Sequence, residues 1–231
     1  MVVIITAIVA EIGAFLIAGL VFYGLKIRYG WMVALFFLLG SIAWTTPLET
    51  LGISTGSYTY SAFAGSLFRG YPGYLVWIGI VPLWIEMGWF IISASSFMIF
   101  HDFLIPRSKT IAAALFAGLF AVDMDLMIDP IASSNKLWVW IGPSMSLMGI
   151  PLYNYVGWFL MIFLYDIIIW NTVVGFRQIR ILSKVERKLL FIKETVSSIS
   201  VSDRAKGFLF RMAVFEILAI FLIKIASVVL Q

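Results

Sequence analysis

Long apolar segments separated by short polar ones run along the whole chain. A helix needs about 20 apolar residues to cross a bilayer. Segments of suitable length cover Val2–Leu25, Trp31–Leu48, Tyr74–Phe100, Thr110–Ile128, Tyr153–Phe176 and Phe208–Val229. The third segment is long and contains Pro82, so we expect a kink or a tilt there. This pattern predicts an all-α, polytopic transmembrane helical bundle of about six spans (six to eight), forming a single integral-membrane domain over residues 1–231.

The composition agrees with a membrane protein and excludes several kinds of site. Hydrophobic residues make up 62% of the chain and charged residues 12%, whereas a soluble domain is about 45–50% apolar and about 25% charged. The chain has no cysteine and one histidine, so we expect no disulfide, no thiol nucleophile and no metal centre. No dinucleotide fingerprint or phosphate-binding loop is present. The first segment lacks a basic start and a cleavage site, which indicates a retained helix.

The basic residues predict the orientation. The loops after the first, third and fifth segments share one side of a six-span protein and carry twelve basic residues, whereas the opposite loops carry only Arg69 and Lys136. Cytoplasmic loops are enriched in Lys and Arg. We therefore expect a multi-pass cell-membrane protein with cytoplasmic basic loops and both termini outside. The placement of the charge, and not the net charge of +4, matters here, and we expect no nucleic-acid partner.

Residues 177–206 form the largest basic segment. Apolar residues such as Ile181, Val185, Leu189 and Ile192 recur there every three or four positions. This periodicity predicts a basic amphipathic cytoplasmic helix before the last span, lying on anionic lipid headgroups. A helix that docks a partner protein is the alternative.

Polar residues converge at the predicted outer end of the bundle. Asp123, Asp125 and Asp129 lie near the outer end of the fourth segment, Glu49 at that of the second, and Asn154 at the start of the fifth. Asp125 and Asp129 are four residues apart and share a helix face, whereas Asp123 points about 120° away from Asp129. A carboxylate in hydrocarbon is costly unless it is paired or neutral. The topology therefore predicts a polar site, although Asp129, which precedes a proline, could simply end the helix.

Other acidic residues lie deeper in the predicted spans. Glu86 is flanked by Trp84 and Trp89. A carboxyl group in apolar surroundings can stay protonated near neutral pH, as a general acid must, but a structural hydrogen bond between helices is an equal alternative. We expect interhelical hydrogen bonds for Glu11, Asp166 and Glu216, and interfacial positions for His101 and Asp102.

Four motifs carry a resemblance to a known family. They are PLETLGISTGSYTY (Pro47–Tyr60), VPLWIEMGWFIISASS (Val81–Ser96), DMDLMIDPIASSNKLWVW (Asp123–Trp140) and GIPLYNYVGWF (Gly149–Phe159). In order and spacing, the chain resembles the membrane carotenoid-biosynthesis hydratases of the CruF type, which include bisanhydrobacterioruberin hydratase and carotenoid 1,2-hydratases. The match covers about residues 44–170.

The resemblance implies a hydro-lyase that adds water across the terminal C=C bond of a linear C40 or C50 carotenoid. The product is a tertiary alcohol, and no cofactor is required. Membrane lipid and other enzymes of the carotenoid pathway are the implied partners.

We assign hypothetical roles to the residues on this basis. Asp125 or Asp129 would donate the proton, with Glu86 as an alternative donor and Asp123 as a further catalytic candidate. Glu49 and Asn154 would hold and activate water. Tyr58 and Tyr60 would hydrogen-bond or relay the proton. Aromatic rings would shape a polyene tunnel and shield the cation, and the candidates are Trp84, Trp89, Trp138, Trp140 and Trp158. For Trp138 and Trp140, an interfacial aromatic belt is an equal alternative.

Three other functions fit the same residues. A lycopene-type cyclase would begin with the same protonation but trap the cation with an internal double bond. A proton-coupled transporter would also place acids in the membrane, and a passive carotenoid-binding protein would leave the pigment unchanged. Transporters often have inverted repeats with broken helices, and we find no such repeat in this chain.

Overall fold

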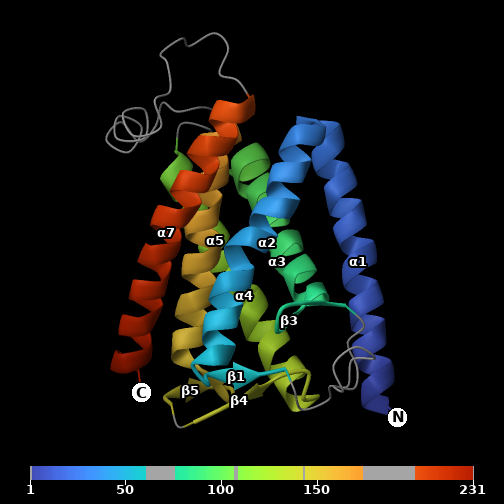
Figure 1. Cartoon of the computed structure of the whole chain (residues 1–231), viewed down its shortest axis with the longest axis vertical. Coiled ribbons are helices and arrows are strands. Elements are labelled where there is room, and N and C mark those ends of the chain that lie inside the picture. Colours follow the sequence, from blue (N-terminus) through green and yellow to red (C-terminus); the bar gives the residue numbers. More distant parts are fainter. Residues whose placement is uncertain (1, 61–75, 107–108, 143, 174–200, 231) are drawn as a thin grey trace.

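The computed structural model describes residues 2–60, 76–106, 109–142, 144–173 and 201–230. Within these ranges, six helices are long and apolar enough to cross a membrane, which confirms the predicted all-α polytopic bundle (Figure 1). They are α1 (Val2–Tyr29), α2 (Trp31–Ser54), α3 (Leu83–Phe97) with a π-helical continuation (Met98–Leu104), α4 (Thr110–Ser134), α5 (Leu152–Val173) and α7 (Val201–Val229).

Six two-residue strands lie in the segments that join these helices. β1 (Tyr58–Thr59) pairs with β4 (Val139–Trp140), β2 (Trp77–Ile78) with β3 (Val81–Pro82), and β5 (Ser146–Leu147) with β6 (Ile150–Pro151), all antiparallel. The β1–β4 ladder joins the loop after α2 to the loop after α4. It lies at the same end of the molecule as both termini (Figure 1).

The bounds of three helices differ from the prediction at prolines. The third helix begins at Leu83, not Tyr74, and Pro82 precedes it in an extended conformation, so this proline produces no kink. Helices α2 and α4 instead continue past Pro47 and Pro130. Prolines are tolerated inside membrane-spanning helices where neighbouring helices satisfy the freed backbone groups. Asp129 therefore lies within α4 and does not end it.

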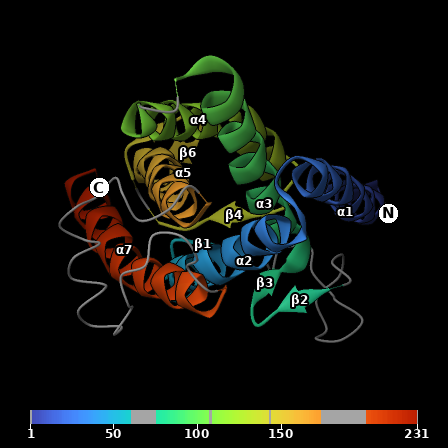
Figure 2. The ribbon, with the colours of Figure 1, turned by 90° about the horizontal axis from the view of Figure 1, so that it is seen from above.

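The helices pack around α3 and α5. Helix α5 lies between α4 and α7, and α3 lies against α1 and α2 (Figure 2). Trp44 of α2 donates a hydrogen bond to the Met161 carbonyl oxygen of α5 (3.0 Å), and Tyr165 of α5 donates one to the Phe37 carbonyl oxygen of α2 (2.9 Å). The outer faces of α1 and α7 expose large apolar side chains such as Leu20 and Ile217, as expected for surfaces in contact with lipid.

A buried His–Asp pair joins the π-helical segment to α5. His101 Nε2 lies 2.6 Å from Asp166 Oδ2, and the imidazole ring packs against both Phe97 and Trp170, with ring centroids 4.6 and 4.3 Å away. The predicted interhelical bond of Asp166 is confirmed. His101 is 1% exposed, so its side chain faces the interior of the bundle. Its interfacial depth in the membrane stays a prediction.

Asp102 forms an ion pair with Arg28 of α1 (2.6 Å) and accepts a hydrogen bond from Tyr29. Glu11 of α1 accepts a hydrogen bond from the Val76 backbone N–H (3.1 Å). The predicted amphipathic helix falls mainly on residues 174–200, which lie outside the described residues. Residues 201–206 belong to α7.

The His101–Asp166 pair gives a test of how the bundle is held together. Replacing either residue alone by leucine leaves the other buried without its partner, which typically costs about 3–5 kcal/mol. Replacing both removes the two polar groups together. We therefore expect the thermal unfolding midpoint in detergent to fall further in His101→Leu and in Asp166→Leu than in the double variant. If the double variant lowered the unfolding midpoint by as much as the sum of the two single variants, a specific pairing of His101 with Asp166 would be contradicted.

Candidate functional site

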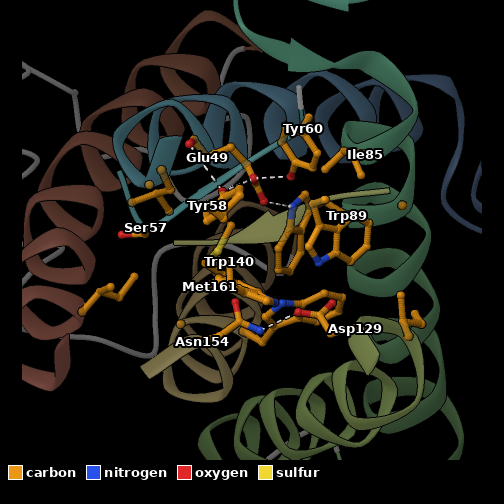
Figure 3. A pocket seen from close by; sticks show the side chains of 18 of the residues that line it. Glu49, Ser57, Tyr58, Tyr60, Ile85, Trp89, Asp129, Trp140, Asn154 and Met161 are labelled. Atoms are coloured by element: carbon orange, nitrogen blue, oxygen red, sulfur yellow. Dashed lines mark hydrogen bonds between the residues drawn. The ribbon is translucent and has the colours of Figure 1, made fainter. Parts of the chain in front are cut away.

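A cavity of about 200 Å³ lies near the end of the bundle that carries the β1–β4 ladder. Helices α2, α3, α4 and α5 supply most of its wall, and α7 contributes Ile223. Figure 3 shows Glu49 on one side of the cavity and Asp129 and Asn154 on the other, with Trp89 and Trp140 between them. The lining is mainly aromatic and aliphatic, with a few polar groups, as is typical of a site for an apolar molecule.

Glu49 is the centre of the polar cluster on the α2 side. Its Oε2 accepts hydrogen bonds from Tyr60 (2.7 Å) and Tyr58, and its Oε1 accepts one from Trp89 Nε1 (2.7 Å). The last turns of α2 carry Glu49, and the chain reverses at once through Gly56, whose positive φ of 75° suits glycine. This turn brings Tyr58 and Tyr60 back onto the carboxyl group.

Gly52 makes room for this arrangement. A Cβ at this position would lie 2.6 Å from the ring of Tyr58. The tyrosine therefore packs directly on the backbone of α2. Burial, and then the nearby Glu49 carboxyl group, raise the pKa of Tyr58 and of Tyr60 well above its usual value. Both hydroxyl groups thus stay protonated as hydrogen-bond donors at any ordinary pH.

Asn154 organises the opposite side of the cavity. Its Nδ2 donates to Asp129 Oδ2 (2.7 Å) and to both oxygens of Asp125 (3.1 and 2.9 Å). Both carboxyl groups are buried, and Asp129 lines the cavity while Asp125 lies behind Asn154. Asp129 Oδ1 is buried and has no hydrogen-bond partner within the described part of the chain. The Asp125–Asp129 pair therefore has one carboxyl oxygen, Asp129 Oδ1, that accepts no hydrogen bond from the described residues.

Aromatic rings form the walls between the two acidic clusters. The ring centroids of Trp89 and Trp158 are 4.4 Å apart, and those of Tyr58 and Trp140 are 5.1 Å apart. Trp84 and Trp138 stack at 6.3 Å. The register Tyr58↔Trp140 of the β1–β4 ladder places residues from two loops against each other. An aromatic face stabilises a nearby cation through its quadrupole.

The cavity gathers most of the residues that the sequence indicated. All seven predicted substrate-binding aromatic residues line it, as do Glu49, Asp129 and Asn154. Asp125 reaches the cavity only through Asn154. Two candidates are not brought together with the others. Asp123 is exposed, and Glu86 is fully buried with a hydrogen bond from Thr45 but does not line the cavity.

Sequence reasoning missed several lining residues. Gly88, Gly157, Met161 and Ile223 line the cavity as well. Gly88 lies four residues after Trp84, so the two residues share a helix face. This spacing could have identified Gly88 as a lining residue. Ile223 gives no such signal in the sequence, because apolar residues of α7 such as Ile223 and the exposed Ile225 are not confined to one face of the helix. Among the residues that the structure describes, no three His, Asp or Glu side chains form a group that could hold a metal ion.

The fold and the cavity define a polytopic helical membrane protein with an internal site for an apolar molecule. Residues 2–224 match the family described as carotenoid biosynthesis protein, and the chain belongs to this family. The resemblance seen in the sequence motifs is therefore confirmed at the level of a membrane carotenoid-biosynthesis family. The comparisons with curated proteins and with solved structures found no match.

Gly88 gives a test of whether the cavity holds a carotenoid. No heavy atom lies within 4 Å of the position that a Cβ would take there, so Gly88→Leu extends into the cavity without a clash. Gly19→Leu is a matched control, because Gly19 also has open space but is exposed on α1. We expect Gly88→Leu to lower the amount of carotenoid that co-purifies with the protein by about tenfold, and Gly19→Leu to leave it unchanged. Equal pigment in both variants would contradict carotenoid binding in this cavity.

Proposed function

We propose that this carotenoid biosynthesis protein is a hydratase, which adds water across the terminal C=C bond of a linear carotenoid. The observation that carries the proposal is the pairing of two different acidic sites in one aromatic cavity. Asp129 and Asn154 lie on one side, and Glu49 with its three donors lies on the other (Figure 3).

Hydration of a trisubstituted alkene needs an acid and a bound water molecule. The acid gives a proton to the less substituted carbon of the double bond, and a tertiary carbocation forms on the other carbon. The water oxygen bonds to this carbon and loses one proton to a base, and proton exchange of the base and the acid with water returns both groups to their starting states. The product has gained one water, and no electrons are exchanged, so the reaction needs no redox cofactor.

The aspartate pair suits the role of acid. Asp125 and Asp129 accept hydrogen bonds from the same amide nitrogen of Asn154. Two neighbouring carboxylates repel each other, and a proton shared between them removes that repulsion. Asp129 faces the cavity and has an oxygen without a partner in the described chain. We therefore assign proton donation to Asp129 and proton exchange with it to Asp125.

Glu49 suits the role of general base. Both of its oxygens already accept hydrogen bonds, from Tyr58, Tyr60 and Trp89. Three donors directed at one carboxyl group favour its ionised form. A carboxylate so placed orients the attacking water as a general base, and its charge opposes that of the carbocation. The rings of Trp89 and Trp158 shield the cation from other nucleophiles.

The nearest competing function is that of a carotenoid cyclase. A cyclase uses the same protonation but excludes water, so that an internal double bond traps the cation. The polar Glu49 cluster favours hydration, because it offers the cavity a fixed acceptor for water. A passive carotenoid-binding protein would have no use for an acid that faces the substrate, and the sequence shows no inverted repeat of the kind that is common in transporters.

The orientation is part of the proposal. Strands β1 and β4, whose Tyr58 and Trp140 line the cavity, lie at the end of the bundle that holds both termini (Figure 1). The junction of α1 and α2, beside Lys26 and Arg28, lies at the opposite end (Figure 1). The positive-inside rule, with the loop charges counted in the sequence, then favours the outer half of the membrane for the site. Water would then reach Glu49 from the outer surface, while the carotenoid stays in the bilayer.

Product mass tests the reaction directly. Cells that accumulate lycopene or bisanhydrobacterioruberin are given the gene for this chain, and the extracted pigments are weighed by mass spectrometry. We expect a gain of one or two waters, because water adds at one or both ends of the pigment. Changed absorption with unchanged mass would mean cyclisation. Unchanged pigments in both strains, with the protein confirmed in the membrane, would contradict a hydratase acting on either carotenoid.

Substitutions test the assigned roles. Asp129→Asn removes the donated proton and Glu49→Gln removes the carboxylate, so we expect each to lower the hydration rate at least about a hundredfold, the usual size of a general acid–base contribution. Asp125→Asn should have a smaller effect, because Asp125 acts through its neighbour. Asp123→Asn changes an exposed carboxyl group on the same helix and should leave the rate nearly unchanged. Full activity of Asp129→Asn would exclude it as the donor.

A further inference from the structure

The cavity is too small for the whole substrate. About 200 Å³ holds a carotenoid end group and a little water, whereas the polyene chain of a C40 pigment is as long as a bilayer leaflet is thick or longer. The chain must therefore leave the cavity through one of its walls. Its apolar character requires an exit into lipid, not into water.

Helix α7 contributes least to the lining of the cavity. Helices α2, α3, α4 and α5 each contribute two or more lining residues, but α7 contributes only Ile223. The residues one turn later on α7 are small, Ala226 and Ser227. On α5, the facing residue is Gly157, and a Cβ there would meet only Ile223 Cδ1, at 4.0 Å. The side chain of Ile223 thus covers a place where α5 has no side chain.

Helices α2 and α7 touch far from this point. Phe208 packs against Phe36, with ring centroids 5.4 Å apart, and lies against Gly40, where an added Cβ would approach it to 2.4 Å. Ile223 is fifteen residues further along α7, a rise of about 22 Å. The ribbons of α2 and α7 diverge from this contact toward the end that carries the C-terminus (Figure 2). Helix α7 instead follows α5.

We propose that Ile223 gates a lateral opening between α2 and α7, through which the polyene chain of the carotenoid passes from the cavity into the lipid. The inference rests on the proposed function for the identity of the substrate. A rotation of one isoleucine side chain opens the wall beside Gly157, and the rigid contact of Phe208 with Gly40 holds the helices together at the other end. Only an end group enters the site, so a linear carotenoid is processed one end at a time.

Bound lycopene tests the gate. Ile223→Trp puts a larger side chain at the opening, and Ile225→Trp is a matched control on the exposed side of α7. The variants are produced in lycopene-accumulating cells and purified, and pigment per protein is measured by absorbance, with the thermal unfolding midpoint as a check on folding. We expect Ile223→Trp to lower the total bound carotenoid, lycopene and hydrated product together, about tenfold, and Ile225→Trp to leave it within about twofold of the parent chain.

A folded Ile223→Trp variant with the carotenoid content of the parent chain would overturn the gate, as would a parent chain that binds neither lycopene nor its hydrated product. Ile223→Ala gives an independent measurement if the tryptophan variant does not fold. Its wider opening should speed the release of bound lycopene into phosphatidylcholine vesicles at least about threefold, and an unchanged release rate would overturn the gate. Bound lycopene that is unchanged in mass, with the contrast between positions 223 and 225 preserved, would refute the hydratase and keep the gate.

Discussion

The structure depends on one constraint, which is that a carboxyl group among apolar helices must be met by donors or by a counter-charge. Leaving such a group unpaired costs several kcal/mol. Glu49 joins α2 to α3 and to the segment after α2, because its donors come from Trp89, Tyr58 and Tyr60. Asp166 joins α5 to the π-helical segment through His101. The acidic residues therefore fix the mutual positions of helices whose apolar surfaces alone would slide past each other.

The short β1–β4 ladder converts this bundle into a site. It joins two loops that are separated by α3 and α4 in the sequence, and it places Tyr58 opposite Trp140. The loops then close one end of the cavity with aromatic side chains while their turns stay at the membrane surface. A site in this position has water on one side and lipid on another. Addition of water to a lipid-dissolved alkene needs both.

The two acidic clusters differ in a way that separates the two halves of the proposed reaction. Glu49 is surrounded by donors, whereas Asp125 and Asp129 share one amide of Asn154. A carboxyl group rich in donors is suited to hold water, and a crowded pair is suited to keep a proton. In the proposed reaction, carboxyl groups thus act as acid on one side and as base on the other because their surroundings differ. The aromatic walls keep the two clusters apart.

The sequence by itself determined the approximate spans, the membrane class, the family and about half of the residues that line the cavity, because hydropathy decides which segments cross a bilayer and the order of crossings brings their ends together. Only the tertiary structure decided which acids face the cavity. It separated Asp129 from the exposed Asp123 and removed Glu86 from the lining. It also turned His101 inward and added Ile223 from a distant helix. The direction of a side chain on a helix that is apolar on every face depends on which neighbours pack against it, and that information is not local in the chain.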